Sequence, residues 1–421
     1  MKFKFFDQPC LLLCVLVSFH AVAANYFVAT DGSDVNAGTT TNSPFATLGK
    51  AANLANPGDS IYVRGGNYNF MSQVSTPRSG TPGQPIRVCA FPGERPVLDF
   101  AGEPVGSAGL ALSKNWWEVY GLEIAHASHN GIKVTGSSNV VERCAVHESG
   151  DTGIHIANGG WNLVLNCDSF HNYDAPTHGQ NADGFSAKWI IGPGNIFSGC
   201  RAWENADDGW DLWMGTNTVV ITNCWAFRNG TNIFGDTAWE GNGNGFKLGG
   251  NYVGTPHRLA RSLAFANNAN GVDQNNNFAG QTLDNNTAWN NAGANFAMNH
   301  GANTTPHIIR NNLSLDGHKS DSFTSGSLLT NNSWQVVSPE ATTNDVMNVD
   351  YSLITGPRRA DGGLPELPFL HPVPAGRLIN QGVNIGEPFS GSAPDLGAYE
   401  SLEPATPSKL SAPSGLRMNL P

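Results

Sequence analysis

The sequence contains few charged residues. Asp, Glu, Lys and Arg make up only 14% of its 421 residues, and 34 acidic against 23 basic residues give a net charge of −11. Such a balance argues against nucleic acid as a partner, because the phosphate backbone attracts clustered Lys and Arg. The negative charge would also repel an acidic polymer unless a cation mediated the contact.

Long apolar runs are missing as well, with one short exception at the start. The run from Leu11 to Val17 follows two lysines and precedes Ala21-Val-Ala, which has the form of a cleavage signal. Because the run is too short to cross a bilayer, we interpret residues 1–24 as a signal peptide. We therefore expect a secreted protein, extracellular or periplasmic, with no membrane association.

Cysteine is scarce, and five cysteines follow the predicted cleavage site. Four of them recur at the spacing of the repeat described below: Cys144, Cys167, Cys200 and Cys224. Secretion permits disulfides, and stacked coils about 4.8 Å apart would make these residues neighbours. We nevertheless favour buried thiols, because the geometry of neighbouring strands need not suit a disulfide.

Glycine, at 49 residues, and asparagine are abundant, which suits a β-rich repeat with tight turns. A glycine opens each of seven short segments: Gly109, Gly131, Gly153, Gly184, Gly209, Gly245 and Gly271. The first and third residues after it are mostly apolar and should point inward, whereas the second should point outward. Since the intervals start at 22 residues and lengthen by insertion, the pattern predicts an all-β fold, a parallel β-helix or solenoid.

Asparagines form a second periodic set, which predicts an asparagine ladder at one turn: Asn172, Asn205, Asn229, Asn267 and Asn291. Before the repeat, Ser43 and Pro44 predict the start of an N-terminal capping helix with Phe45 and Leu48 on its apolar face. We thus expect one β-helix catalytic domain over residues 25–400 and a Pro/Ser-rich tail over residues 401–421.

Three related phrases lie between residues 181 and 250: Asn181-Ala-Asp-Gly-Phe, Asn205-Ala-Asp-Asp-Gly-Trp-Asp-Leu and Gly243-Asn-Gly-Phe-Lys-Leu. The repeat places Asp183 and Asp208 at equivalent turn positions, with Asp207 adjacent. It also places Asp211 and Lys247 side by side on the outer face. Two inserted loops, His171–Gln180 and Gly230–Gly241, should flank this point.

An aspartate before glycine is ordinarily a turn residue, but four aspartates in register indicate more than turns. Carboxylates this close would repel one another, and a hard divalent cation relieves the repulsion. Oxygen-only ligands in a shallow, solvent-open setting favour calcium over zinc. Lys133, which occupies the strand position of Lys247, is interpreted as a solvated strand lysine, whereas Lys247 gains its significance from Asp211.

Calcium beside a lysine suggests β-elimination of a uronic acid polymer. The cation would neutralise the uronate carboxylate while Lys247 takes the C5 proton. Candidates for binding substrate carboxylates are Lys188, Arg228, Arg258 and Arg261. Candidates for stacking on sugar rings are Trp189, Trp213 and Trp239.

The aspartate and lysine phrases, with their spacing, resemble those of the family 9 polysaccharide lyases, which are secreted pectate lyases with a right-handed parallel β-helix. The resemblance covers most of the chain after residue 24. It implies polygalacturonate (pectate) as substrate and proton abstraction by Lys247. It also implies calcium ligation by four aspartates, which are Asp183, Asp207, Asp208 and Asp211. We expect the enzyme to be a monomer.

Three alternatives stay open at this point. An inverting β-helix glycoside hydrolase would use the aspartates as acid and base and need neither calcium nor Lys247. A lyase could act on another acidic glycan. A non-catalytic binding or adhesive β-helix is the third, since a fold does not dictate a function.

Overall fold

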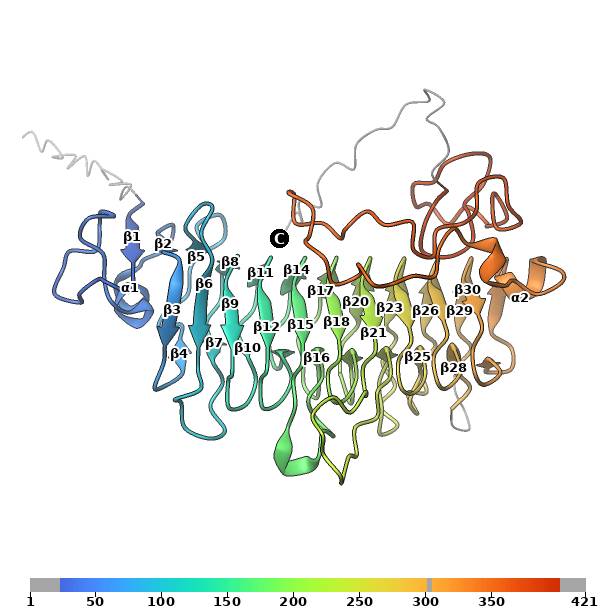
Figure 1. Ribbon diagram of the computed structural model, residues 1–421, viewed down its shortest axis with the longest axis horizontal. Helices are drawn as coiled ribbons and strands as arrows, with labels where there is room; N and C mark the ends of the chain where they lie inside the picture. The colour runs from blue at the N-terminus through green and yellow to red at the C-terminus, as the bar shows by residue number, and fades with distance from the viewer. Residues whose placement is uncertain (1–22, 301–304, 402–421) are drawn as a thin grey trace, which may run out of the picture.

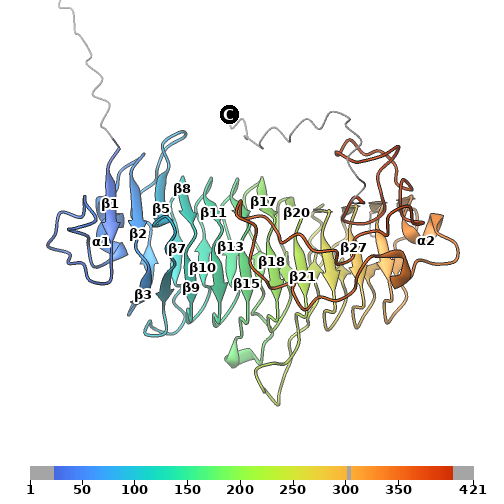
Figure 2. The same cartoon turned by 45° about the horizontal axis from the view of Figure 1, so that its top comes forward.

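The computed structural model describes residues 23–300 and 305–401, so most of the predicted signal peptide and tail lie outside the described residues. The described chain forms a long solenoid of three parallel sheets, in which each winding between the first and the last contributes one strand to each sheet (Figures 1 and 2). The predicted all-β fold class, a parallel β-helix, is confirmed.

Within each sheet the strands succeed one another along the solenoid axis. Sheet A contains β1 (Asn25–Val28), β2 (Ser60–Val63), β5 (Ile86–Ala90), β8 (Trp117–Tyr120), β11 (Val140–Glu142), β14 (Leu163–Leu165), β17 (Asn195–Ser198), β20 (Val219–Thr222), β23 (Arg258–Ala260), β26 (Thr282–Asp284), β29 (Ile308–Arg310) and β32 (Leu328–Thr330). Sheet B contains β3 (Gly66–Asn69), β6 (Pro96–Asp99), β9 (Glu123–Ala125), β12 (Ala145–His147), β15 (Asp168–Phe170), β18 (Arg201–Trp203), β21 (Trp225–Phe227), β24 (Leu263–Phe265), β27 (Thr287–Trp289) and β30 (Leu313–Leu315). Sheet C contains β4 (Val74–Ser75), β7 (Leu110–Leu112), β10 (Ile132–Val134), β13 (Ile154–Ile156), β16 (Phe185–Ala187), β19 (Trp210–Asp211), β22 (Phe246–Lys247), β25 (Val272–Asp273), β28 (Phe296–Met298) and β31 (Ser322–Phe323). The helices are α1 (Leu48–Leu54) and α2 (Ser333–Val336), with 3₁₀ turns η1 (Ala175–Thr177) and η2 (Thr343–Asp345).

The glycine that precedes each sheet C strand is required by close packing between windings. At Gly184, an added Cβ would lie 2.6 Å from the Cβ of Ala202 and 2.8 Å from the carbonyl oxygen of Gly209. The next residue then points into the core, where Phe185 stacks on Trp210 with ring centroids 4.6 Å apart. Glycine and the following apolar residue thus fix the register from one winding to the next.

The predicted asparagine ladder is confirmed inside the solenoid. Asn205 Nδ2 donates to Asn229 Oδ1 at 3.0 Å, and Asn229 Nδ2 donates to Asn267 Oδ1 at 3.0 Å. The same oxygens accept backbone N–H groups at 3.2 Å, and all three side chains are fully buried or nearly so. Each amide therefore satisfies the backbone at a corner that ordinary sheet pairing leaves unpaired.

Another set of asparagines makes the sharp corners between sheets A and B. Asn166, Asn223 and Asn285 have φ angles of 53°, 52° and 52°, in the left-handed region. Asparagine tolerates this conformation better than most residues, because its short side chain bonds locally. The abundance of this residue type therefore follows from the number of corners.

The cysteine column consists of buried, unbridged thiols, as predicted. Cys144, Cys167, Cys200 and Cys224 are all buried, and no disulfide forms among the described cysteines. The Sγ atoms of Cys200 and Cys224 each lie 3.4 Å from the backbone nitrogen of the preceding cysteine of the column. The thiols thus fill a narrow column of the core.

The capping helix exists but begins later than predicted. Thr47, not Ser43, is its N-cap, and the Thr47 hydroxyl accepts the N–H of Lys50 at 3.2 Å. Asp34 draws the preceding segment away from helical geometry by accepting the N–H groups of Ala46 and Thr47, each at 3.0 Å. Phe45 instead forms a β-bridge with Val28 at the outer edge of sheet A, and helix α1 buries Leu48, Ala51 and Ala52 in the core at this end of the solenoid.

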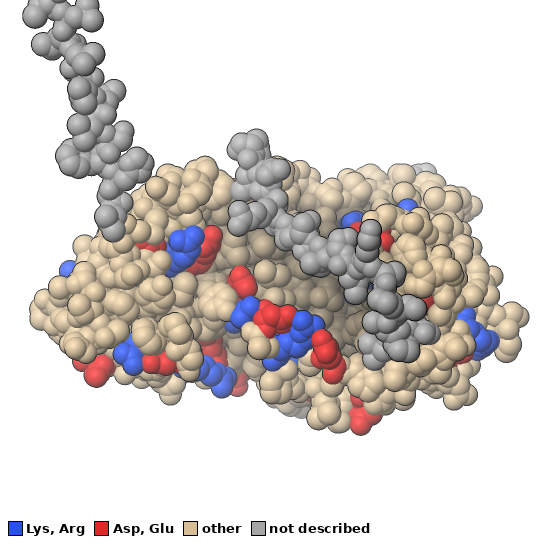
Figure 3. All heavy atoms as spheres, turned by 90° about the horizontal axis from the view of Figure 1, so that it is seen from above, with Lys and Arg blue, Asp and Glu red and all other residues tan. Residues whose placement is uncertain are grey.

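After the last winding the chain turns back along the solenoid (Figures 1 and 2). This returning segment, residues 337–401, packs apolar side chains such as Phe369 and Ile354 against aromatic residues on the outer face of sheet B. Arg358 fastens it to an earlier winding through Asp168 and the carbonyl oxygen of Cys167. Charges on the face seen in Figure 3 gather in small groups of both signs with wide uncharged areas between them.

Candidate active site

The five residues singled out in the sequence lie together on sheet C. Lys247 on β22 is the register partner of Asp211 on β19, so their side chains leave neighbouring windings from equivalent positions. Asp183 precedes β16, and Asp207 and Asp208 precede β19. Oxygen atoms of the four aspartates all lie within 4.8 Å of one another.

One oxygen of each of the four carboxylates accepts a backbone N–H, which for Asp183 Oδ1 is that of Asp208 at 3.3 Å. Oδ1 of Asp207 accepts from Asn242 at 2.6 Å, Oδ1 of Asp208 from Asn244 at 2.8 Å, and Oδ1 of Asp211 from Trp213 at 2.9 Å. The bonds from Asn242 and Asn244 cross from the following winding, so both side chains are fixed before any ligand arrives. The other oxygens are left to meet at the centre of the cluster.

Two lysines share these central oxygens. Lys188 Nζ lies 2.7 Å from Asp183 Oδ2 and 2.8 Å from Asp211 Oδ2. Lys247 Nζ lies 3.0 Å from Asp208 Oδ2 and 3.4 Å from Asp211 Oδ2. Asp211 is therefore bonded to both ammonium groups, and it connects the two halves of the cluster.

Burial and mutual repulsion set the ionisation of the aspartates. Burial raises the pKa of Asp183 to about 8 and raises that of Asp207 and Asp208, to which neighbouring carboxylates contribute. Burial also opposes ionisation of Asp211, but the two lysines outweigh it and lower the pKa of Asp211. For Lys247, burial disfavours the charged form, but Asp208 and Asp211 outweigh it and raise the pKa.

The cluster fits a divalent cation. Four carboxylates and two ammonium groups leave a formal charge of −2 in a buried space. Asp207 Oδ2 is buried without a hydrogen-bond partner among the described residues, although a buried carboxylate oxygen normally has one. Oxygen donors alone, with one oxygen orphaned, match the chemistry of a hard cation such as Ca²⁺.

The aspartates are more enclosed than the expected shallow, solvent-open setting. At most 2% of each is exposed. The two predicted inserted loops precede β16 and β22, and they contact each other, because Tyr173 of the first stacks on Phe234 of the second with centroids 4.7 Å apart. Asp236 joins the loops by accepting hydrogen bonds from the Tyr173 hydroxyl at 2.7 Å and from His178 Nδ1 at 2.9 Å. The two loops extend together from one side of the solenoid (Figure 1).

An open groove of about 440 Å³ leads to the cluster along sheet C. Lys188, Asp211 and Lys247 line it near the aspartates, and Trp189 and Trp213 line it as well. Of the three tryptophans considered from the sequence, Trp239 lies elsewhere, packed with Tyr173 and Phe234 between the two loops. Three further polar residues lie in or next to the groove, although no sequence motif singled them out: Thr152, His155 and Ser186.

The three arginines considered as substrate ligands do not reach this groove. Arg228 bonds to Glu204 at 2.7 Å on the sheet B side. Arg258 on sheet A bonds to Asp284 and Glu387, and Arg261 donates to the carbonyl oxygen of Pro388 at 2.6 Å. Arg258 and Arg261 thus hold the returning segment, and only Lys188 of the four candidates meets the aspartates.

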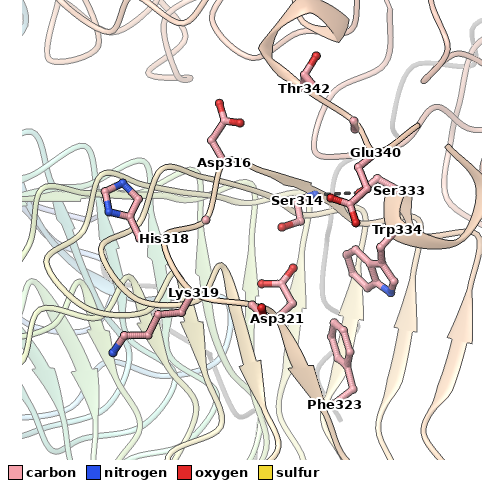
Figure 4. A pocket seen from close by; sticks show the side chains of 13 residues that line it. Ser314, Asp316, His318, Lys319, Asp321, Phe323, Ser333, Trp334, Glu340 and Thr342 are labelled. Atoms are coloured by element: carbon pink, nitrogen blue, oxygen red, sulfur yellow. Dashed lines mark hydrogen bonds between the residues drawn. The ribbon is translucent and has the colours of Figure 1, made fainter. Parts of the chain in front are cut away.

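Another hollow lies at the C-terminal end of the solenoid (Figure 4). Phe323 and Trp334 stack there with centroids 4.9 Å apart, where helix α2 covers the last winding. Asp316, Asp321 and Glu340 also line it. None of the predicted site residues contributes to this hollow, so we assign the candidate active site to the groove on sheet C.

The fold agrees with comparisons to known proteins. The model of the Pel9A-like right-handed β-helix region matches residues 26–312, which include the whole aspartate and lysine cluster. The chain belongs to this family. The predicted family 9 resemblance and the right-handed solenoid are thereby confirmed.

Members and neighbours of the Pel9A-like family show how far the likeness extends. Pectate lyase L of Dickeya chrysanthemi is 42% identical over 392 residues, covering 89% of this chain and 90% of that protein. The crystal structure of pectate lyase Pel9A superimposes with a TM-score of 0.84 at 40% identity, covering 90% of this chain and 97% of the other. A rhamnogalacturonan lyase matches with a TM-score of 0.74 at 27% identity, covering 83% and 97%.

No helix among residues 23–300 and 305–401 is both long and apolar enough to cross a membrane.

Proposed function

We propose that this protein is a secreted, calcium-dependent pectate lyase that cleaves polygalacturonate by β-elimination. Its family membership and the pectate lyases that it resembles along most of their length support the activity. The single observation that carries the mechanism is Lys247, whose Nζ lies at the edge of four clustered aspartates and faces an open groove.

Asp183, Asp207, Asp208 and Asp211 would hold the calcium ion, which supplies Lewis-acid stabilisation of a uronate carboxylate when bound. The backbone donors behind Asp207, Asp208 and Asp211 orient these side chains. Once the carboxylates are committed to a cation, they hold the proton of Lys247 less strongly. The amine can then serve as a base in the groove.

The reaction requires little else from the chain. Lys247 Nζ takes the proton from C5, the electron pair forms the C4–C5 double bond, and the C4–O bond breaks. The departing oxygen leaves with a proton from solvent. Lys188 stays on the opposite side of Asp211 and keeps that carboxylate ionised, so Asp211 remains a ligand and not a competing acid.

The spacing of the carboxylates argues against the hydrolase alternative. An inverting hydrolase keeps its two carboxyl groups about 6.5–9.5 Å apart, so that a water molecule fits between them. The four aspartates of this cluster converge within 4.8 Å, and two of them are ion-paired with Lys188. A purely adhesive role does not account for the buried charges, which are costly to keep.

A lyase for rhamnogalacturonan is the second candidate, because a rhamnogalacturonan lyase shares the fold at 27% identity. Both candidates use the same groove and elimination chemistry. Incubation with polygalacturonate and, separately, with rhamnogalacturonan, followed by ultraviolet absorbance of unsaturated ends, distinguishes them. We expect absorbance with polygalacturonate that a chelator abolishes; reducing ends without absorbance would instead identify a hydrolase.

A further inference from the structure

The groove extends well beyond the proposed catalytic centre. Its outward-facing floor is a column of register partners on five adjacent strands: Lys133, His155, Ser186, Asp211 and Lys247. Four steps of about 4.8 Å place Lys133 about 19 Å along the solenoid from Lys247, measured along the backbone. Lys133 and His155 both line the groove. The part of the groove around them, here called the far arm, is therefore continuous with the proposed catalytic centre at Lys247.

Lys133 differs from the other two lysines of the groove. Lys188 and Lys247 are ion-paired with aspartates, whereas Lys133, half-buried on β10, has no ion pair within the described part of the chain. Asp151, an acidic residue that lines the same groove, is already engaged by His129 Nε2 at 3.2 Å and by Asn130 Nδ2 at 3.1 Å. An unneutralised ammonium in the groove of an acidic protein is a site for an anion.

His155, on the neighbouring strand, offers a hydrogen-bond acceptor. Asp183 Oδ2 accepts from the Thr152 hydroxyl at 3.0 Å, which commits the one proton of Thr152. Ser186 therefore donates to Thr152 at 3.4 Å, and it accepts from His155 Nδ1 at 2.7 Å. This relay places the ring proton on Nδ1 and leaves Nε2 as an acceptor without a partner among the described residues.

An aromatic wall stands beside this pair. The half-exposed ring of Trp189 lies edge-on to His155, with centroids 5.5 Å apart, and Trp213 lies 6.3 Å beyond it. The arm therefore presents a cation, a hydroxyl acceptor and an apolar surface. A uronic acid residue carries the matching groups, which are a carboxylate, hydroxyl donors and the apolar face of a pyranose ring.

We infer that Lys133 and His155 form a distal subsite that binds one uronate residue of the polymer, with Lys133 on the carboxylate and His155 Nε2 on a hydroxyl. This inference rests on the proposed function and specifies how the same groove selects its substrate. Lys133 acts on binding alone, because its strand β10 is separated from β19 and β22 by β13 and β16. The subsite favours long, unesterified chains over short ones.

Steady-state kinetics of Lys133→Met in saturating calcium tests the inference. We expect KM for polygalacturonate to rise about tenfold while kcat changes less than about twofold, since a charge-assisted contact is lost. For the shortest oligogalacturonate that the wild type cleaves, the two proteins should have similar KM values. Lys50→Met, which removes an exposed lysine on the distant helix α1, is the matched control. Equal KM values on the polymer for Lys133→Met and wild type would overturn the inference.

His155 is tested by a pair of variants with intact thermal unfolding. His155→Gln keeps a side-chain oxygen that can accept a hydroxyl, whereas His155→Phe keeps only the ring. We expect the KM for polygalacturonate to rise more in His155→Phe than in His155→Gln. A KM unchanged in both variants would remove His155 from the subsite.

Electrophoresis in gels that contain polygalacturonate and a chelator separates this inference from the proposed function. Wild type and Lys50→Met should be retarded equally, and Lys133→Met less. If wild type cleaves no pectate but shows this pattern, the proposed function fails and the subsite stands. If Lys133→Met is retarded as much as wild type, or wild type is not retarded at all, the subsite is refuted.

Discussion

Asp211 and Lys247 are partners on adjacent strands, and a second lysine reaches the same carboxylate from the other side. Asp211 Oδ2 lies 3.4 Å from Lys247 Nζ and 2.8 Å from Lys188 Nζ. The Asp211 carboxylate thus binds two lysine ammonium groups in a space that also contains three more aspartates. This balance of charge decides how the centre should respond to substitution and to calcium.

Removing the proposed base should abolish turnover without unfolding the protein. In saturating calcium, Lys247→Ala is expected to lower kcat on polygalacturonate by about 10²- to 10⁴-fold, because general base catalysis contributes on that order. Ultraviolet absorbance of unsaturated products measures the rate, and circular dichroism checks the fold. Lys50→Ala controls for loss of a lysine, and a near-normal rate of Lys247→Ala would exclude Lys247 as the base.

Calcium should raise the unfolding temperature of the wild type, and a chelator should reverse the rise. Calcium at 100 times its dissociation constant would stabilise the folded state by about 2.7 kcal/mol. Magnesium at the same concentration should do less, because it accepts irregular oxygen cages poorly. Differential scanning calorimetry measures both, and a melting temperature indifferent to calcium would argue against the metal site.

Asp207→Asn should have effects of opposite sign with and without calcium. Without the ion, the amide relieves repulsion around the orphaned Asp207 Oδ2, so the variant should melt higher than wild type by a few degrees, on the order of 1 kcal/mol. With calcium, the lost ligand should weaken binding about 10- to 100-fold and reverse the order. Isothermal titration calorimetry measures the calcium affinity, and thermal melts with and without calcium measure the stability.

The exposed Asp316→Asn is the control for this experiment. It changes net charge equally but lies outside the cluster. A variant at Asp207 that melts lower than wild type in chelator would show that the apo cluster does not strain the fold.

Acid should loosen the returning segment through Asp168. Burial opposes its ionisation, but Arg201 and Arg358 outweigh burial and lower the pKa of Asp168. The stabilisation that ionised Asp168 gives the folded state is therefore fully present above the pKa of an unfolded aspartate, about 3.9. It is lost as the pH falls through the lower pKa that Asp168 has in the folded state. Asp168→Asn should cost about 2–3 kcal/mol at pH 7, and the difference from wild type in urea unfolding should vanish at lower pH. A difference constant with pH would contradict this assignment.

One rung of the asparagine ladder should matter for stability alone. Asn229→Ala removes bonds to Asn205, Asn267 and the carbonyl oxygen of Ala202 inside the solenoid. Unsatisfied buried groups should lower the free energy of unfolding by about 2–3 kcal/mol or more. Urea unfolding checks this, with Asn384→Ala at an exposed turn as control, and equal stability of both variants would contradict it.

The periodic parts of the fold were predictable from the sequence, because each repeated residue has one physical task. Gly184 marks a close contact between windings, Asn229 a ladder rung and Cys200 a core column, and aligning these columns already places Asp211 beside Lys247. Lys188 follows its strand and belongs to no column. Its long side chain nevertheless reaches the cluster across a winding, which spacing alone cannot reveal.

Other features depend on long-range contacts without any period. The two inserted loops meet through Tyr173 and Phe234, which are distant in sequence. The returning segment, which occupies Arg258 and Arg261, shows no repeat at all. His155 had a detectable signal, because it shares its strand position with Asp211 and Lys247, but its hydroxyl relay required coordinates.

The column of unbridged cysteines has a consequence for handling the enzyme. While the protein is folded, its four buried sulfurs are shielded from dissolved oxygen. Unfolding in air would expose reactive thiols that can form non-native disulfides, and these disulfides block refolding. Heat inactivation of this protein would then be irreversible, and a reducing agent would slow it. The storage life would be set by the rate of unfolding.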